Sequence, residues 1–167
     1  MAARADVPVI VVRGDGDRPA AGSVTAAVHG ASDLGWLLLA AAEADAREAA
    51  LRLVSVWNLL TYVSVATMLD DLDEIARRRV HEVKALADLV REFSPGLIVS
   101  HHVETGTSTP GILVEASVHT DLLVMGRGHR ALGAGRSLGR VAHVLLHHAH
   151  CRVEVVPPAF ATRVEET

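Results

Sequence analysis

Short apolar runs alternate with longer helical runs along most of this chain, and this alternation limits the possible folds more than any other feature. The apolar runs are bounded by Gly, Pro, Asp or Ser, as strands are. The predicted strands are Val24–Val28, Leu51–Trp57, Leu97–Glu104, Asp121–Met125 and Arg152–Val156. The predicted helices are Leu34–Ala49, a long run from Asp70 to Ser94, Gly111–His119 and a run from about Gly139. This spacing predicts an α/β fold, in which an open parallel sheet carries helices on both faces.

The chain length of 167 residues suits one domain with one hydrophobic core. We expect this domain at residues 23–157, after a strand and linker at residues 1–22 and before a tail at residues 158–167. The extra N-terminal strand is Val7–Val12, and the linker is rich in Gly, Asp and Pro. Hydrophobic residues make up 50% of the chain but aromatic residues only 3%, which predicts a core of Val, Leu, Ile and Ala.

Composition and charge argue against several kinds of partner. The net charge of -4 gives no general reason to expect a nucleic acid. The longest apolar run, Leu34–Ala42, is too short for a membrane span, which needs roughly 20 residues. Cys151 is the only cysteine, so no internal disulfide is possible and a reducing cytoplasm is the expected location.

A glycine-rich loop follows the predicted strand Asp121–Met125 and leads into a helix. Its glycines are Gly126, Gly128, Gly133, Gly135 and Gly139. Such a loop lets backbone N–H groups approach a ligand, and a helix N-terminus attracts anions. The stretch between Leu122 and Val153 contains five Arg and no Asp or Glu. We therefore predict an anion site here, and a solvated basic face is the alternative.

Two common phosphate motifs do not fit this loop. A P-loop requires Lys-Ser/Thr where Ala134-Gly135 stands. A dinucleotide fingerprint requires an acid about 20 residues further on, and no acid occurs before Glu154.

The loop does resemble that of the universal stress protein family, which reads Gly-x2-Gly-x9-Gly-Ser/Thr. Met125-Gly126 and Gly139 match its spacing, and residues 148–156 resemble the family's closing His-Ala-Pro-Cys-Pro-Val-x-Val-Val. The family's opening motif is matched by residues 28–32, except that His29 stands where the family has Asp. The other departures are His129 for the second Gly, Arg140 for Ser/Thr, and His150 and Arg152 for two prolines.

The resemblance implies a flavodoxin-like fold of the adenine nucleotide alpha hydrolase-like type, with the strands of the domain in the order 3-2-1-4-5. It also implies that ATP or another adenine nucleotide is bound without dedicated catalysis, with no metal beyond a nucleotide-bound Mg. The implied nucleotide-binding residues are Val28, His29, Gly30, Val56, Met125, Gly126, Gly128, His129, Arg130, Gly139, Arg140 and Val141.

Two other functions stay open at this point. One is a degenerate domain that binds no nucleotide and acts through dimerisation or other protein contacts. The other is an ATP-using enzyme of the pyrophosphatase-loop type, which is disfavoured because residues 29–33 lack the Ser-Gly-Gly-x-Asp-Ser loop. His143, His147 and His150 fall at helical spacing on one face and could bind a metal, although a plain helix surface is the preferred interpretation.

Residues 1–22 resemble the end of the first domain in tandem universal stress proteins. In this family the last strand lies at a sheet edge, where two domains commonly meet. We therefore expect a homodimer formed through the edge strand Arg152–Val156 and the N-terminal strand Val7–Val12, with antiparallel pairing of Val7–Val12 to an edge strand.

Overall fold

A computed structural model describes residues 5–12, 18–58, 69–127 and 139–158, and it contains one six-stranded sheet. The strands are β1 (Val9–Val11), β2 (Ser23–Ala27), β3 (Ala50–Asn58), β4 (Val99–Gly106), β5 (Leu122–Gly126) and β6 (Arg152–Val156). Their order across the sheet is β1-β6-β5-β2-β3-β4. The five strands β2 to β6 are parallel, and β1 is antiparallel. Both the predicted α/β fold and the predicted order of the domain strands are confirmed.

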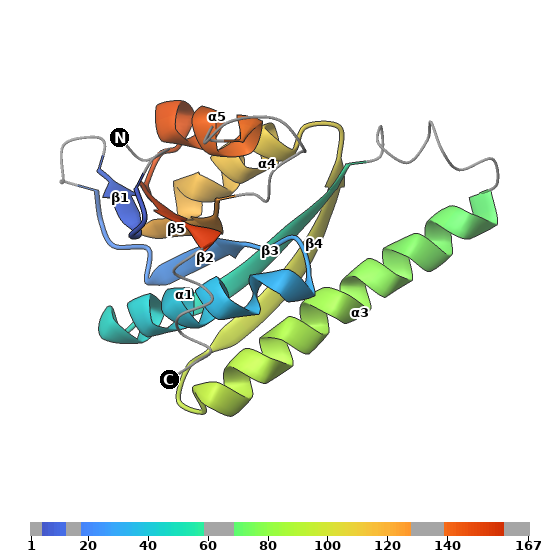
Figure 1. The fold of residues 1–167 in the computed structure, drawn as a ribbon, viewed down its shortest axis with the longest axis horizontal. Helices are drawn as coiled ribbons and strands as arrows, with labels where there is room; N and C mark the ends of the chain where they lie inside the picture. Colours follow the sequence, from blue (N-terminus) through green and yellow to red (C-terminus); the bar gives the residue numbers. More distant parts are fainter. Residues whose placement is uncertain (1–4, 13–17, 59–68, 128–138, 159–167) are drawn as a thin grey trace.

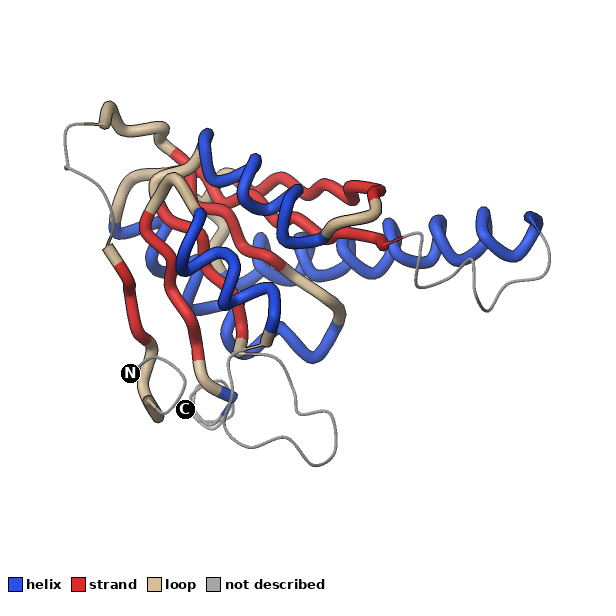
Figure 2. The backbone as a smooth tube through the Cα atoms, turned by 90° about the horizontal axis from the view of Figure 1, so that it is seen from above, coloured by secondary structure: helices blue, strands red, loops and turns tan. Residues whose placement is uncertain are grey.

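Helices cover both faces of the sheet (Figure 1). On one face lie α1 (Leu34–Ala46) and α3 (Leu69–Phe93), and on the other lie α4 (Thr109–Ala116) and α5 (Arg140–His148). Short 3-10 turns at Ala31–Asp33 and Ser117–His119 precede α1 and follow α4. The 25-residue helix α3 extends past the sheet at its N-terminal end, as Figure 2 also shows. None of the helices in the described ranges is long and apolar enough to cross a membrane.

The core is aliphatic, as the composition predicts, and the sheet divides it into two halves. Leu51 and Leu53 of β3 face α1 and α3, whereas Val54 faces α4 and α5. Ala40 and Ala44 of α1 are completely buried, so α1 packs close to the sheet through small side chains. Burying large aliphatic side chains contributes about 1.5–3 kcal/mol each.

Two helix boundaries differ from the predicted ones for local reasons. Helix α1 ends at Ala46 rather than Ala49, because Glu48 adopts a left-handed conformation with φ of 51° that terminates the helix. Helix α4 begins at Thr109 rather than Gly111, because the Ser108 side chain caps it by accepting a hydrogen bond from Gly111 N (3.2 Å).

The predicted antiparallel pairing of the N-terminal strand with an edge strand of the domain is confirmed, and because it occurs within the chain, the last strand β6 is not itself the outermost strand. β1 pairs with β6 in antiparallel register, with Val9 opposite Val155 and Val11 opposite Val153. A side-chain contact also holds the segment before β1, because Arg127 Nη1 donates a hydrogen bond to Ala5 O (3.0 Å). The chain's own N-terminal strand therefore occupies the edge of β6, and the outer strands are β1 and β4.

The three histidines predicted to share one helix face do not do so. Helix α5 ends at His148, and Ala149 is extended with ψ of 145°, so His150 lies beyond the helix. The rings of His143 and His147 are 4.6 Å apart. Across the residues that the structure describes, no group of three or more His, Cys, Asp or Glu is arranged to hold a metal ion.

Glu154 in β6 is an acid buried inside the sheet layer. Its side chain is only 2% exposed, and its Oε2 has no hydrogen-bond partner among the described residues. Burial raises its pKa to about 7, the negative charge of Glu43 adds to this rise, and Arg47 opposes it. Because this pKa lies above the ordinary value of 4.5, the folded protein holds a proton that the unfolded chain releases at lower pH.

The contribution of Glu154 to stability is therefore complete below about pH 4.5 and falls as the pH rises through 7, by roughly 3 kcal/mol in total. Between pH 5 and pH 8, wild type should lose roughly 2–3 kcal/mol more unfolding free energy than Glu154→Gln, which has no titrating proton. Urea denaturation at the two pH values measures this difference. The same pH dependence in both proteins would show that Glu154 is ionised in the fold.

Candidate nucleotide-binding site

The candidate site lies where the order of the strands reverses, between β2 and β5. These strands are parallel neighbours, with Val24 opposite Leu122 and Ala27 opposite Met125. The chain leaves β2 toward α1 on one face of the sheet and leaves β5 toward α5 on the other. The two connections therefore separate and leave a crevice beyond the strand ends, which is where open α/β sheets bind ligands.

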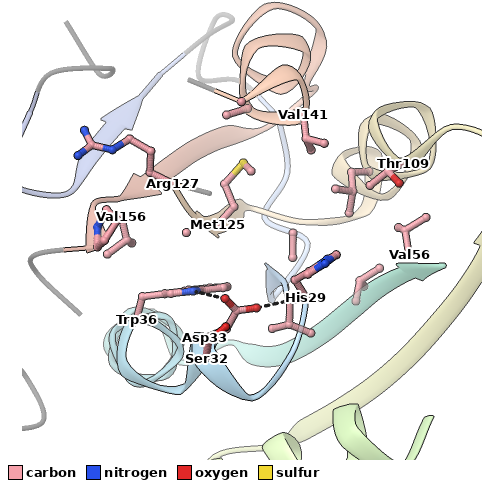
Figure 3. A pocket seen from close by; sticks show the side chains of 18 of the residues that line it. His29, Ser32, Asp33, Trp36, Val56, Thr109, Met125, Arg127, Val141 and Val156 are labelled. Atoms are coloured by element: carbon pink, nitrogen blue, oxygen red, sulfur yellow. Dashed lines mark hydrogen bonds between the residues drawn. The ribbon is translucent and has the colours of Figure 1, made fainter. Parts of the chain in front are cut away.

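A cavity of about 820 Å³ occupies this crevice (Figure 3). Its lining comes from the ends of β2, β3, β5 and β6 and the first turns of α1, α4 and α5. The lining residues are Ala27, Val28, His29, Ser32, Asp33, Gly35, Trp36, Val54, Val56, Thr109, Leu113, Met125, Gly126, Arg127, Gly139, Arg140, Val141, Ala142, Val156 and Pro158. The volume falls in the range of about 300–1,000 Å³ that is usual for small-molecule sites.

One end of the cavity is apolar. Val56, Thr109 and Val141 lie around it, from β3, α4 and α5 (Figure 3). Leu113 and Val54 complete this end and are almost fully buried. Aliphatic walls of this kind suit a flat, apolar ring such as a nucleobase.

Another part of the cavity wall is basic. Arg127 follows β5 and Arg140 begins α5, and both line the cavity. The first N–H groups of α5 have no partner within the helix, and the helix dipole is positive at that end. Gly139 precedes α5, and a Cβ atom there would meet nothing within 4 Å. This wall can therefore accept an anionic group.

The carboxylate of Asp33 fixes the turn that follows β2. Its Oδ2 accepts hydrogen bonds from the backbone N–H groups of His29 and Gly30, and its Oδ1 accepts one from Trp36 Nε1 (3.0 Å). On the other side of the turn, the Arg79 side chain of α3 donates to the backbone carbonyl of His29. These contacts hold the first cavity loop in one conformation.

The indole of Trp36 packs directly against Gly126 at the end of β5. A Cβ atom at position 126 would lie 2.6 Å from Trp36 Nε1 and 3.0 Å from its Cδ1. Only a glycine leaves room for this contact between α1 and β5. Gly126 therefore serves the packing of the cavity wall, besides any role in the approach of a ligand.

The structure brings most of the predicted site residues into this cavity. Those that line it are Val28, His29, Val56, Met125, Gly126, Gly139, Arg140 and Val141. Gly30 is next to the cavity but does not line it. Gly128, His129 and Arg130 lie outside the described residues. That a nucleotide contacts this set stays a prediction.

Sequence reasoning missed several residues that shape the site. In the sequence, Asp33 is a candidate cap of the helix that follows it, and nothing indicates a role of Trp36, Thr109 or Leu113 in the site. Arg79 belongs to a run of three arginines, which is typical of a solvated helix face, but its side chain is only 18% exposed and reaches the His29 turn. Nothing in the sequence distinguishes Arg79 from the two arginines before it, because its contact with the His29 turn depends on how α3 packs against the sheet.

The fold and the site together define an open α/β protein with a ligand crevice at the strand reversal. The profile of the Universal stress protein family matches residues 24–157, and the chain belongs to that family. A comparison with curated proteins finds none that matches this chain.

Solved structures of universal stress proteins share this fold. A universal stress protein in complex with cAMP is 20% identical with a TM-score of 0.60, over 81% of this chain and 96% of that chain. The Archaeoglobus fulgidus protein in complex with dAMP is 18% identical with a TM-score of 0.55, over 80% and 95%. A putative universal stress protein from Pseudomonas aeruginosa is 19% identical with a TM-score of 0.63, over 99% of this chain but only 58% of its own length.

Replacing Gly126 with Ala should displace the Trp36 indole and destabilise the protein by about 1–3 kcal/mol, as overpacking does. Gly139→Ala is the matched control, since its Cβ would stand in open space, and it should change stability by no more than about 0.5 kcal/mol. Chemical denaturation measures both. A Gly126→Ala protein as stable as Gly139→Ala would contradict the packing between Trp36 and Gly126.

Proposed function

We propose that this chain is a stress-response module that binds an adenine nucleotide in the crevice between β2 and β5. The observation that carries the proposal is the cavity itself, because it joins an apolar end to a basic wall at a helix N-terminus. A base would occupy the end near Val56, Thr109 and Leu113, and phosphate would lie near Arg140 and α5. The complexes of related structures with cAMP and dAMP support this ligand class.

The same proposal assigns no dedicated catalysis to the site. Asp33 is the one carboxylate among the described lining residues, and it already accepts hydrogen bonds from three N–H groups of the turn, so it is not available as a general base. The nucleotide then acts by its presence rather than by its turnover. We also propose a cytoplasmic location, since the buried single Cys151 forms no internal disulfide.

Nucleotide binding is tested by placing a bulky side chain at the entrance of the basic wall. Gly139→Trp should lower the affinity for AMP at least tenfold, because its indole would enter the space beside the first turn of α5. Gly139→Ala should bind as wild type does. Calorimetry with AMP, ADP, ATP and cAMP measures the affinities, and thermal melting confirms that both variants fold.

If no nucleotide gives binding heat or raises the melting temperature at millimolar concentration, the proposed nucleotide binding is wrong, and the alternative of a domain that binds no nucleotide takes its place. The domain would then act through protein contacts alone.

We further propose that the protein is a homodimer formed through β1, since β6 itself is covered. β1 is an outer strand of the sheet, and the apolar residues Val7, Ile10 and Val12 are 59%, 41% and 64% exposed. Pro8 lacks an N–H group and lies just before β1, so it interrupts no hydrogen bond of the strand. An exposed apolar outer strand is a template for pairing with a second chain.

The dimer is tested with lysines at both ends of β1. Val7→Lys combined with Val12→Lys should convert the dimer to monomer in light scattering, because charges disfavour pairing at a sheet edge. The matched control is Phe93→Lys combined with Ile98→Lys, which changes two residues of 64% and 75% exposure next to the opposite edge.

Deleting residues 1–22 should expose the edge of β6 and yield monomer or aggregate. A truncated protein that stays a well-behaved dimer of unchanged stability would exclude this role of β1.

A further inference from the structure

The cavity offers one carboxylate among its described lining residues, and that carboxylate is committed to the fold. Asp33 uses three of its roughly four acceptor positions for His29 N–H, Gly30 N–H (3.1 Å) and Trp36 Nε1 (3.0 Å). A protein usually holds the Mg²⁺ of a nucleotide complex through one or two carboxylates, besides water and the phosphate oxygens. Turning Asp33 toward such an ion would break the contacts that hold the first cavity loop.

No other carboxylate lines the cavity among the residues that the structure describes. Residues 128–138, which connect Arg127 to Gly139, contain no Asp or Glu and carry Arg130 and Arg136. His29 lines the cavity and is a donor or a neutral acceptor, so it adds no negative charge. The donor set of the site therefore does not fit the Mg²⁺ of a magnesium–nucleotide complex.

The charges of the same wall fit a bare phosphate. Arg140 lines the cavity at the first position of α5, where its cation adds to the positive end of the helix dipole. Arg127 also lines the cavity on the β5 side, but its guanidinium turns toward the N-terminal segment, where Nη1 donates to Ala5 O (Figure 3). A guanidinium binds phosphate through charge-assisted hydrogen bonds, and a Mg²⁺ ion on the phosphate would weaken that attraction.

We propose that this site takes its adenine nucleotide as a metal-free anion, with Arg140 and the N-terminus of α5 in the place of Mg²⁺. The ligand class is then a nucleoside monophosphate or a cyclic monophosphate, rather than a magnesium–triphosphate complex. The inference rests on the proposed nucleotide binding and adds the form in which the nucleotide is recognised.

Calorimetry with AMP, cAMP and ATP, each in EDTA and in excess Mg²⁺, tests this inference. AMP and cAMP should bind with the same affinity in both conditions. ATP should bind about tenfold more weakly in Mg²⁺, because the ion covers phosphate oxygens that a guanidinium would otherwise contact; tenfold corresponds to about 1.4 kcal/mol. Binding that appears or tightens only in Mg²⁺ would overturn the inference and leave the proposed function intact. Absence of binding by all three nucleotides in both conditions would overturn both.

Two variants show which groups take the place of the metal. Arg140→Gln should weaken AMP binding about tenfold in EDTA and in Mg²⁺ alike. Arg152→Gln is the control with the same change of charge, since Arg152 is exposed at the start of β6, at the opposite end of that strand from the cavity. Equal AMP affinities for the two variants would show that Arg140 makes no contact with the nucleotide and would contradict the inference.

His29→Asp should create the acidic site that the wild type lacks. It should weaken AMP binding in EDTA, and Mg²⁺ should recover at least part of the loss, because a carboxylate that is not committed to the fold would then line the cavity. Mg²⁺ that has no effect on this variant would show that the nucleotide phosphate is remote from the His29 turn.

Discussion

The parallel pairing of β2 with β5 is the interaction on which the rest of the structure depends. It joins two halves of the chain that are about 100 residues apart, and it sets the carboxyl ends of both strands at one edge of the sheet. The connections that leave these ends lead to helices on opposite faces, so none of the described helices closes the space between them. The crevice follows from this topology alone, and the side chains that line it decide its chemistry.

Asp33 and Gly126 maintain the crevice from its two sides. Asp33 accepts hydrogen bonds from three N–H groups and so holds the turn after β2 in a single conformation. One of these groups belongs to Trp36, whose indole lies against Gly126 of β5. A single connected set of contacts therefore runs from the first strand of the domain to the fourth. It links the turn after β2 to the end of β5 without any contact from a ligand.

The extra strand β1 changes the surface of the domain rather than its interior. Pairing with β6 satisfies backbone groups that the domain alone would leave exposed, and it contributes to the burial of Glu154, whose neighbour in register is Ile10. β1 therefore takes the place of β6 as the outer strand on this side of the sheet. The open edge on this side of the sheet is therefore that of β1, whereas the sequence assigned the proposed dimer contact jointly to Val7–Val12 and to the last strand.

The sequence by itself determined the elements, their order and the family, because hydrophobic periodicity and glycine spacing are local features of the chain. The alternation of strands and helices identified the parallel sheet, and the spacing of Gly126 and Gly139 located the basic wall. Only the tertiary structure decided that Arg79 reaches the His29 turn, that Trp36 fills the space over Gly126, and that β1 folds back on β6 of its own chain. The reason is physical: these contacts join segments that are distant in sequence. Their partners are set by the packing angle of a helix or the reach of a linker, and no local pattern records either one.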